Sequence, residues 1–173
     1  MLTKNMQKAL NDQFNAEYYS AYLYLSMSAY FKSCDLDGFA SWMYYQYQEE
    51  QMHAMKFYDF ICQRGGRVRL DTIEAPQAEW DSPQAVFDAT LAHEQKVTGL
   101  INGLVDTALA EHDHAASIFL QWFVTEQVEE EENVTGVLNK LRLLKDAPGG
   151  IFMLDQELAQ RGTPGAAAGT EST

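Results

Sequence analysis

The stretch Gln48-Glu49-Glu50-Gln51-Met52-His53 decides the fold, because it places strongly polar side chains in the middle of an otherwise apolar helix face. Apolar residues recur around it at spacings of three and four from Phe39 to Phe60, which is the pattern of a helix packed in a bundle. We call such a stripe a seam. Glu50 and His53 both occupy the seam, one helical turn apart, so a carboxylate and an imidazole interrupt a buried face.

Four long helices account for most of the chain. Only Pro76 and Pro83 precede Pro148, so long stretches contain nothing that breaks a helix. Gly65-Gly66 is a strong helix stop, and Ser82-Pro83 is a cap followed by a first-turn proline. We predict helices at about Thr3–Lys32, from Gly38 to about Arg64, from Pro83 to about Glu111, from the turn His112-Asp113-His114 to about Lys145, and a short apolar helix at Ile151–Leu158.

The lengths of the connections predict the topology. Short turns join the first helix to the second and the third to the fourth, so each pair forms an antiparallel hairpin. The irregular segment Arg67–Asp81 is long enough to carry the chain along a helix before the second hairpin starts. We therefore predict an all-α fold, a four-helix bundle with one long crossover and a short C-terminal fifth helix. We expect residues 1–160 to form one domain and the small and polar residues 161–173 to form a disordered tail.

Every seam turns polar near its middle. The middle of a helix lies at half-height whichever way the helix runs, so these polar side chains meet at one level of the bundle. The two halves of the chain repeat the pattern at an offset of 77 positions. The equivalent pairs are Glu17 and Glu94, Glu50 and Gln127, and His53 and Glu130.

A buried layer of four carboxylates needs positive charge. Burying one ionised carboxylate costs several kcal/mol even after relaxation, against a total stability of about 5–15 kcal/mol. His53 is the only evident basic side chain in the layer, and one imidazolium cannot balance four carboxylates. Two divalent cations can balance them. The alternative is a buried polar network that fixes the register of the helices.

The ligand types suit iron, manganese or zinc, because all three accept oxygen ligands together with imidazole. No cysteine lies in the layer, which argues against an iron–sulfur cluster. Gln127 is interpreted as a neutral ligand or as a hydrogen-bond donor to bound oxygen species. We assign one metal ion to Glu17, Glu50 and His53, and a second to Glu94, Glu130 and the shared Glu50.

Three further carboxylates stand one step from the central ligands, on the flank of the layer. They are Glu49, Glu126 and Glu129, and they could hold a third, weaker cation. A solvated acidic face is the alternative interpretation, because exposed carboxylates are common without any bound ion.

Two aromatic residues and one histidine stand near the layer. Tyr24 lies two turns after Glu17 on the first seam, where it could donate a hydrogen bond or an electron. Trp122 is a second candidate donor, and ordinary core packing is the alternative for both. His93 lies off the seam beside Glu94, so we expect it at the surface.

Composition limits the partners of the protein. The net charge is −13, with 25 acidic and 12 basic residues, so the chain repels nucleic acid and anionic membranes and attracts cations. No apolar stretch is long enough to span a bilayer, and Met1–Phe14 lacks the apolar core of a signal peptide. Cys34 and Cys62 are too few for a disulfide framework. We therefore expect a cytoplasmic protein without nucleic-acid or membrane partners.

Four segments together resemble prokaryotic non-haem ferritins. The resemblance covers about Met1 to Leu158, and its motifs are specific because residues on four helices match in type and spacing. The matching segments are Gln13-Phe14-Asn15-Ala16-Glu17, Gln48-Glu49-Glu50-Gln51-Met52-His53, His93-Glu94 and Phe119-Leu120-Gln121-Trp122-Phe123-Val124-Thr125-Glu126-Gln127-Val128-Glu129-Glu130.

The resemblance implies a function. It implies an iron-storage protein that oxidises iron(II) with dioxygen or peroxide and stores ferric oxyhydroxide inside a homo-oligomeric shell, usually of twenty-four subunits. The helix Ile151–Leu158 resembles the one that lines a shell axis, and Tyr24 corresponds to a tyrosine beside the ferroxidase centre. The implied centre is Glu17, Glu50, His53, Glu94, Gln127 and Glu130, with a third iron site at Glu49, Glu126 and Glu129.

The chain departs from related families at informative positions. Bacterioferritins carry a haem-ligating Met directly after the bridging Glu, but Gln51 stands here, so we predict no haem. Animal ferritins line their iron channels with acidic residues, where Ser117 and Leu120 stand in this chain. A rubrerythrin-like di-iron peroxidase and a non-catalytic helical bundle remain as alternatives, although the cysteine-rich module of the first is missing.

Overall fold

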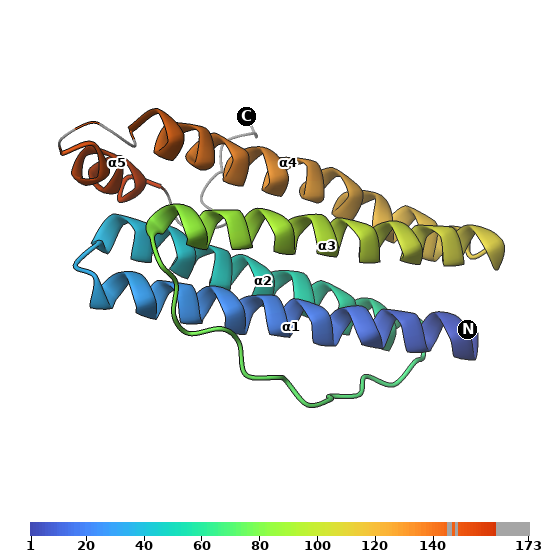
Figure 1. The fold of residues 1–173 in the computed structure, drawn as a ribbon. Coiled ribbons are helices and arrows are strands. Elements are labelled where there is room, and N and C mark those ends of the chain that lie inside the picture. Colours follow the sequence, from blue (N-terminus) through green and yellow to red (C-terminus); the bar gives the residue numbers. More distant parts are fainter. Residues whose placement is uncertain (145–146, 148, 162–173) are drawn as a thin grey trace, which may run out of the picture.

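The computed structural model describes residues 1–144, 147 and 149–161 of the chain, and within them it forms five helices and no strand. Figure 1 shows two long hairpins packed side by side, with a short helix at one end. The predicted fold is confirmed. The predicted tail lies outside the described residues apart from Arg161, as does the predicted end of the fourth helix at Lys145. The helices are α1 (Lys4–Ser33), α2 (Asp37–Gln63), α3 (Pro83–Ala110), α4 (His114–Leu144) and α5 (Gly150–Leu158).

Two helices begin with caps from their own segments. The Thr3 hydroxyl accepts a hydrogen bond from the Met6 amide at the start of α1. Ser82 does the same for the Ala85 amide of α3, and proline follows it in the first turn, as the sequence predicts. Such caps satisfy amides that have no partner inside the helix.

The start of α2 is capped from the far end of the chain. Leu36 stands at its cap position and cannot accept a hydrogen bond with its side chain. The Asp155 carboxylate of α5 instead accepts from the amides of Gly38 and Phe39, at 2.8 and 3.0 Å. A Cβ atom at Gly38 would lie 1.7 Å from the Asp155 carbonyl oxygen, so this close approach requires glycine.

The crossover runs along the outside of α1, from the end of α2 to the start of α3 (Figure 1). Two asparagines of α1 fix it by pairing with its backbone. Asn11 donates to the Arg67 carbonyl and accepts from the Arg69 amide, at 3.2 and 2.6 Å. Asn15 pairs in the same way with Arg69 and Asp71. The crossover backbone is therefore satisfied without forming a helix or strand of its own.

The apolar core consists of two clusters, one toward each end of the bundle. The first surrounds Phe31, Phe39 and Phe87 and includes Leu154 and Leu158 of α5. The second surrounds Leu10, Phe57 and Phe123 near the opposite end. The seams turn polar between these clusters, as predicted. Among the described residues, no helix has the length and hydropathy needed to cross a bilayer.

Candidate metal centre

A polar layer separates the two apolar clusters. Four helices contribute to it, and each of its six side chains is at most 5 % exposed. The surrounding seams explain this burial, because each polar residue follows apolar neighbours at helical spacing. The members of the layer are Glu17 from α1, Glu50 and His53 from α2, Glu94 from α3, and Gln127 and Glu130 from α4.

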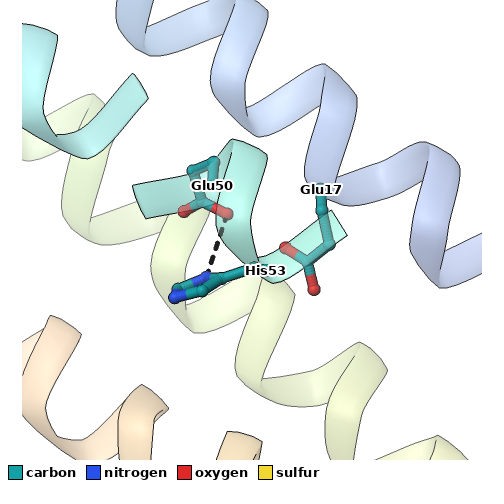
Figure 2. Close-up of side chains that lie close together, drawn as sticks. All are labelled: Glu17, Glu50 and His53. Atoms are coloured by element: carbon teal, nitrogen blue, oxygen red, sulfur yellow. Dashed lines mark ion pairs between the residues drawn. The ribbon is translucent and has the colours of Figure 1, made fainter. Parts of the chain in front are cut away.

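The α1–α2 side of the layer, which we call the first half-site, consists of Glu17, Glu50 and His53. Figure 2 shows the three side chains turned toward one another, and one ligand atom of each lies within 4.8 Å of the others. His53 Nδ1 lies 3.4 Å from Glu50 Oε2. Oε2 of Glu17 and Oε2 of Glu50 are buried and accept no hydrogen bond from the described residues. A cation between them would satisfy both oxygens.

The α3–α4 side, which we call the second half-site, consists of Glu94, Gln127 and Glu130. Here the carboxylates already have donors. Glu94 accepts hydrogen bonds from the Tyr24 hydroxyl and, at 3.1 Å, from the Gln127 amide. Glu130 accepts from the Gln46 amide at 2.7 Å. A cation at this side would have to displace hydrogen bonds.

Burial dominates the electrostatics of the layer. It raises the pKa of Glu50 to about 7 and that of Glu130 to about 8, and the neighbouring Glu94 adds to both shifts. Burial also raises the pKa of Glu17 and Glu94. Without a cation, Glu130 therefore keeps its proton at neutral pH and Glu50 keeps it for part of the time. A metal ion would take the place of those protons and release them.

His53 experiences the opposite balance. Burial by itself lowers the pKa of the imidazole, but the carboxylates of Glu126, Glu50 and Glu17 together raise it well above its ordinary value. The imidazole thus carries a proton that a metal ion would have to replace. This makes His53 the internal counter-charge of the polar layer, as the sequence indicates.

The three flanking carboxylates are not gathered around one point. Glu126 groups with His53 and Glu130, and one of its oxygens lies 3.8 Å from His53 Nε2. Glu49 forms an ion pair with Arg161 at 2.9 Å, and Glu129 is exposed. The third cation site at these residues stays a prediction.

Tyr24 is fully buried beside the second half-site. Its hydroxyl donates to Glu94, and burial followed by the charge of Glu94 raises the pKa of the phenol well above its ordinary value. Trp122 lies on the other side, with its ring centroid 5.3 Å from that of His53 and Lys56 over its face. Both aromatic residues are thus close to the layer.

Two amides that orient the carboxylates were not among the residues assigned to the layer. Gln13 donates to Glu17 at 2.8 Å, and Gln46 donates to Glu130. Gln13 lies four residues before Glu17 on the same face of α1, and Gln46 was already on the α2 seam. Helical spacing from a predicted ligand could therefore have identified both.

The expectation that His93 lies at the surface is wrong. Its side chain is half-buried, and its Nε2 lies 2.8 Å from the Ser20 hydroxyl of α1. Burial, with a smaller effect from Lys96, lowers the pKa of His93 to about 4. The residue lies off the α3 seam but faces α1, because α1 and α3 pack against each other.

Comparison with known proteins agrees with this architecture. Residues 7–144 match the family model described as a ferritin-like domain. The chain is 44 % identical over 161 residues to a bacterial non-heme ferritin of Bacteroides fragilis (strain 638R), covering 93 % of this chain and 100 % of the relative. The chain belongs to the ferritin family. The resemblance seen in the sequence is thereby confirmed.

Other ferritins agree over the same length. A bacterial non-heme ferritin of Staphylococcus epidermidis (strain RP62A) is 39 % identical, over 93 % of this chain and 97 % of the relative. An open pore ferritin from the archaeon Archaeoglobus fulgidus superposes with a TM-score of 0.92 at 51 % identity, covering 94 % of this chain and all of the other. The similarity covers both hairpins and the crossover of this ferritin chain. The helices that carry the polar layer therefore belong to the fold that these ferritins share.

Proposed function

We propose that this chain is a subunit of an iron-storage protein that oxidises iron(II) at the polar layer and retains the ferric product. The observation that carries the proposal is the pair of buried oxygens on Glu17 and Glu50 that accept no hydrogen bond, beside the His53 imidazole. A buried carboxylate oxygen without a partner is costly unless a cation or proton satisfies it. Membership of the ferritin family identifies iron as the cation that fits best.

The proposed reaction has iron(II) as its substrate. Each ion that is oxidised gives up one electron, and two such ions reduce one dioxygen, with two protons, to hydrogen peroxide; peroxide could serve as the oxidant in turn. Every electron lost leaves one more positive charge on the metal. Four carboxylates in a medium of low dielectric constant stabilise that added charge more strongly than water does.

Each residue has a proposed role in this reaction. Glu50 lies between the two half-sites, because the charges of both Glu94 and Glu130 reach it. We assign one iron ion to the first half-site and a second to Glu94, Glu130 and the shared Glu50, with Gln127 as a neutral ligand or donor. Tyr24 is proposed to hold Glu94 by its hydrogen bond or, as the alternative, to supply an electron in place of one from iron(II). Glu49, Glu126 and Glu129 are proposed to take a third iron ion.

Storage requires assembly, and we propose a homo-oligomeric shell, usually of twenty-four subunits in this family. Large apolar side chains exposed on the isolated chain support this, including Ile118 and Val128, which are 75 % and 66 % exposed. We place the protein in the cytoplasm, which agrees with its free and exposed Cys34 and Cys62. We propose that it contains no haem, and an absorption spectrum without a Soret band after purification is the expected result.

The first experiment compares aerobic iron(II) oxidation by the apoprotein and by a Glu50→Ala/His53→Ala variant. We expect fast oxidation with a soluble ferric product from the wild type and a large loss in the variant. Met52→Ala/Asp59→Ala is the matched control, because both residues are exposed on the same helix. If wild type and Glu50→Ala/His53→Ala both match the background rate, the oxidation proposal is wrong and a non-catalytic bundle becomes the better interpretation.

A further inference from the structure

Arg161 turns back from the end of α5 onto the middle of α2. Its Nη2 donates to Glu49 Oε2 at 2.9 Å, although 112 positions separate the two residues. The guanidinium also lies over the Trp42 ring, with Cζ 4.5 Å from the ring centroid. The two charged side chains are only 23 % and 21 % exposed. A pair sheltered in this way is held more firmly than an ion pair in open solvent.

Three contacts of α5 place the arginine there. Asp155 binds the first amides of α2, and Leu154 and Leu158 are buried in the first apolar cluster. The Arg161 amide continues the turn by donating to the Leu158 carbonyl at 3.2 Å. The arginine therefore follows directly from a docked helix.

Glu49 is the carboxylate that Arg161 holds, and it directly precedes Glu50 of the first half-site. It is close enough to Glu126 and His53 for their charges to act on it. Our proposed function assigns Glu49 and Glu126 to a third iron ion. Without a bound cation, Arg161 therefore supplies the positive charge beside Glu49.

We propose that Arg161 is a built-in competitor for the third cation: its guanidinium occupies Glu49, and a metal ion gains Glu49 as a ligand only when the guanidinium leaves. This inference rests on the proposed function of the flanking carboxylates. Arg161 engages one oxygen of Glu49, and its guanidinium repels a divalent cation at the same carboxylate, so the ion pair weakens cation binding there. The guanidinium does not lose its proton at any pH where proteins fold, so deprotonation of Arg161 does not release Glu49.

The competition has a consequence for the order of loading. The first half-site offers oxygens that accept no hydrogen bond, whereas the flank offers a carboxylate that is already paired. Cations therefore fill the first half-site first and reach Glu49 only at higher concentration. Arg161 thereby raises the cation concentration needed to occupy Glu49 above the concentration that fills the first half-site.

The test is a calorimetric titration with Zn²⁺, which binds without redox chemistry, on the assembled full-length protein. All variants carry Glu50→Ala/His53→Ala/Glu94→Ala, which disables both half-sites and leaves the binding step at the flanking carboxylates. We expect added Arg161→Ala to tighten that step by about tenfold or more, which corresponds to about 1.4 kcal/mol. We expect no such gain when Glu49→Ala is also present, because the competitor then has nothing to hold.

Two further variants separate competition from loosening of α5. Arg161→Gln keeps hydrogen-bond donors but removes the charge, so it should also tighten Zn²⁺ binding, even if Arg161→Ala disturbs the fold. Lys140→Ala removes an exposed ion pair between α4 and Glu157 of α5, and it should leave Zn²⁺ affinity unchanged. Unchanged or weaker binding in both Arg161 variants, or an equal gain with Lys140→Ala, would overturn the inference.

Failure of this inference is distinguishable from failure of the proposed function. If the otherwise unmodified protein oxidises iron(II) but removal of Arg161 leaves Zn²⁺ binding unchanged, only the competitor role is wrong. If iron oxidation never exceeds background while Zn²⁺ binding still tightens without Arg161, the ferroxidase proposal falls and the competition stands.

Discussion

The two half-sites contain similar ligand types at an offset of 77 positions, yet the hydrogen bonds to their carboxyl groups differ. In the first, buried oxygens of Glu17 and Glu50 accept no hydrogen bond. In the second, Glu94 and Glu130 accept hydrogen bonds from Tyr24, Gln127 and Gln46. Glu17 and Glu50 thus each keep one buried oxygen that accepts no hydrogen bond, whereas both oxygens of Glu94 accept one.

The affinity of a half-site for a cation therefore depends on the hydrogen-bond donors beside its carboxyl groups as well as on the ligands themselves. A cation at the first half-site gains oxygens without breaking any of their hydrogen bonds. A cation at the second must replace hydrogen bonds to its carboxyl groups, each contributing about 0.5–1.5 kcal/mol. We therefore expect two binding steps, of which the first half-site supplies the tighter.

Glu50→Ala should have the largest effect, because this carboxylate is proposed to serve both half-sites. We expect iron(II) oxidation to slow by about 100-fold, since loss of even an outer-shell partner reduces metal-site activity by about 10–100-fold. Stopped-flow absorbance of the ferric product measures the rate. Glu132→Ala, an exposed carboxylate on α4, is the control and should stay near the wild-type rate.

Substitution at equivalent positions tests the difference between the half-sites directly. Glu17→Ala should weaken the tight Zn²⁺ step by at least about tenfold, because it removes an open oxygen ligand. Glu94→Ala should leave the tight step within about threefold and remove the weaker one. A titration in which the two variants lose the same step would contradict the proposed asymmetry.

Glu130→Gln should stabilise the apoprotein, and the gain should grow with pH. The pKa of Glu130 is raised to about 8, so between its ordinary value of 4.5 and about 8 the folded protein holds a proton that the unfolded chain releases. The contribution of Glu130 to the free energy of unfolding is fully present below about pH 4.5 and is lost as the pH rises toward 8.

Glutamine stays neutral throughout, so Glu130→Gln removes that loss. We expect a gain of about 2 kcal/mol in unfolding free energy at pH 8 and almost none at pH 4.5. Urea unfolding of the metal-free protein at both pH values measures it. An equal gain at the two pH values would mean that the proton on Glu130 is not responsible.

Tyr24→Phe should have the smallest effect. Without the hydroxyl, Glu94 no longer accepts a hydrogen bond from residue 24. A cation that binds Glu94 then has one hydrogen bond fewer to displace. We expect the weaker Zn²⁺ step to tighten by about threefold while the first step stays unchanged. Weaker binding in Tyr24→Phe would show that the hydroxyl positions Glu94 for the metal ion.

Regular features of the sequence were sufficient for the fold and for the composition of the polar layer. Ser82-Pro83 predicted the start of α3 because a cap and a proline act locally. The layer followed from interrupted seams, since a polar residue at a seam position is necessarily buried when the helices pack. Family resemblance then supplied the ligand roles, which remain predictions.

Features that depend on side-chain direction across helices could not be predicted. His93 has no seam signal of its own and is half-buried against Ser20 and Tyr24 of α1. Which carboxylates are engaged depends on where the Tyr24 hydroxyl and the Gln46 amide reach, which helical spacing does not determine. Arg161 reaches Glu49 only because α5 folds back on α2, a contact between distant parts of the chain.

The cap that Asp155 places on α2 has a consequence for protein synthesis. The first hairpin leaves the ribosome early, but the carboxylate that completes its second helix is made more than a hundred residues later. Chains grow at about 5–20 residues per second, so the first amides of α2 lack the Asp155 carboxylate for several seconds after they are made. A chain that ends before Asp155 would therefore keep the Gly38 and Phe39 amides at the start of α2 without this carboxylate partner.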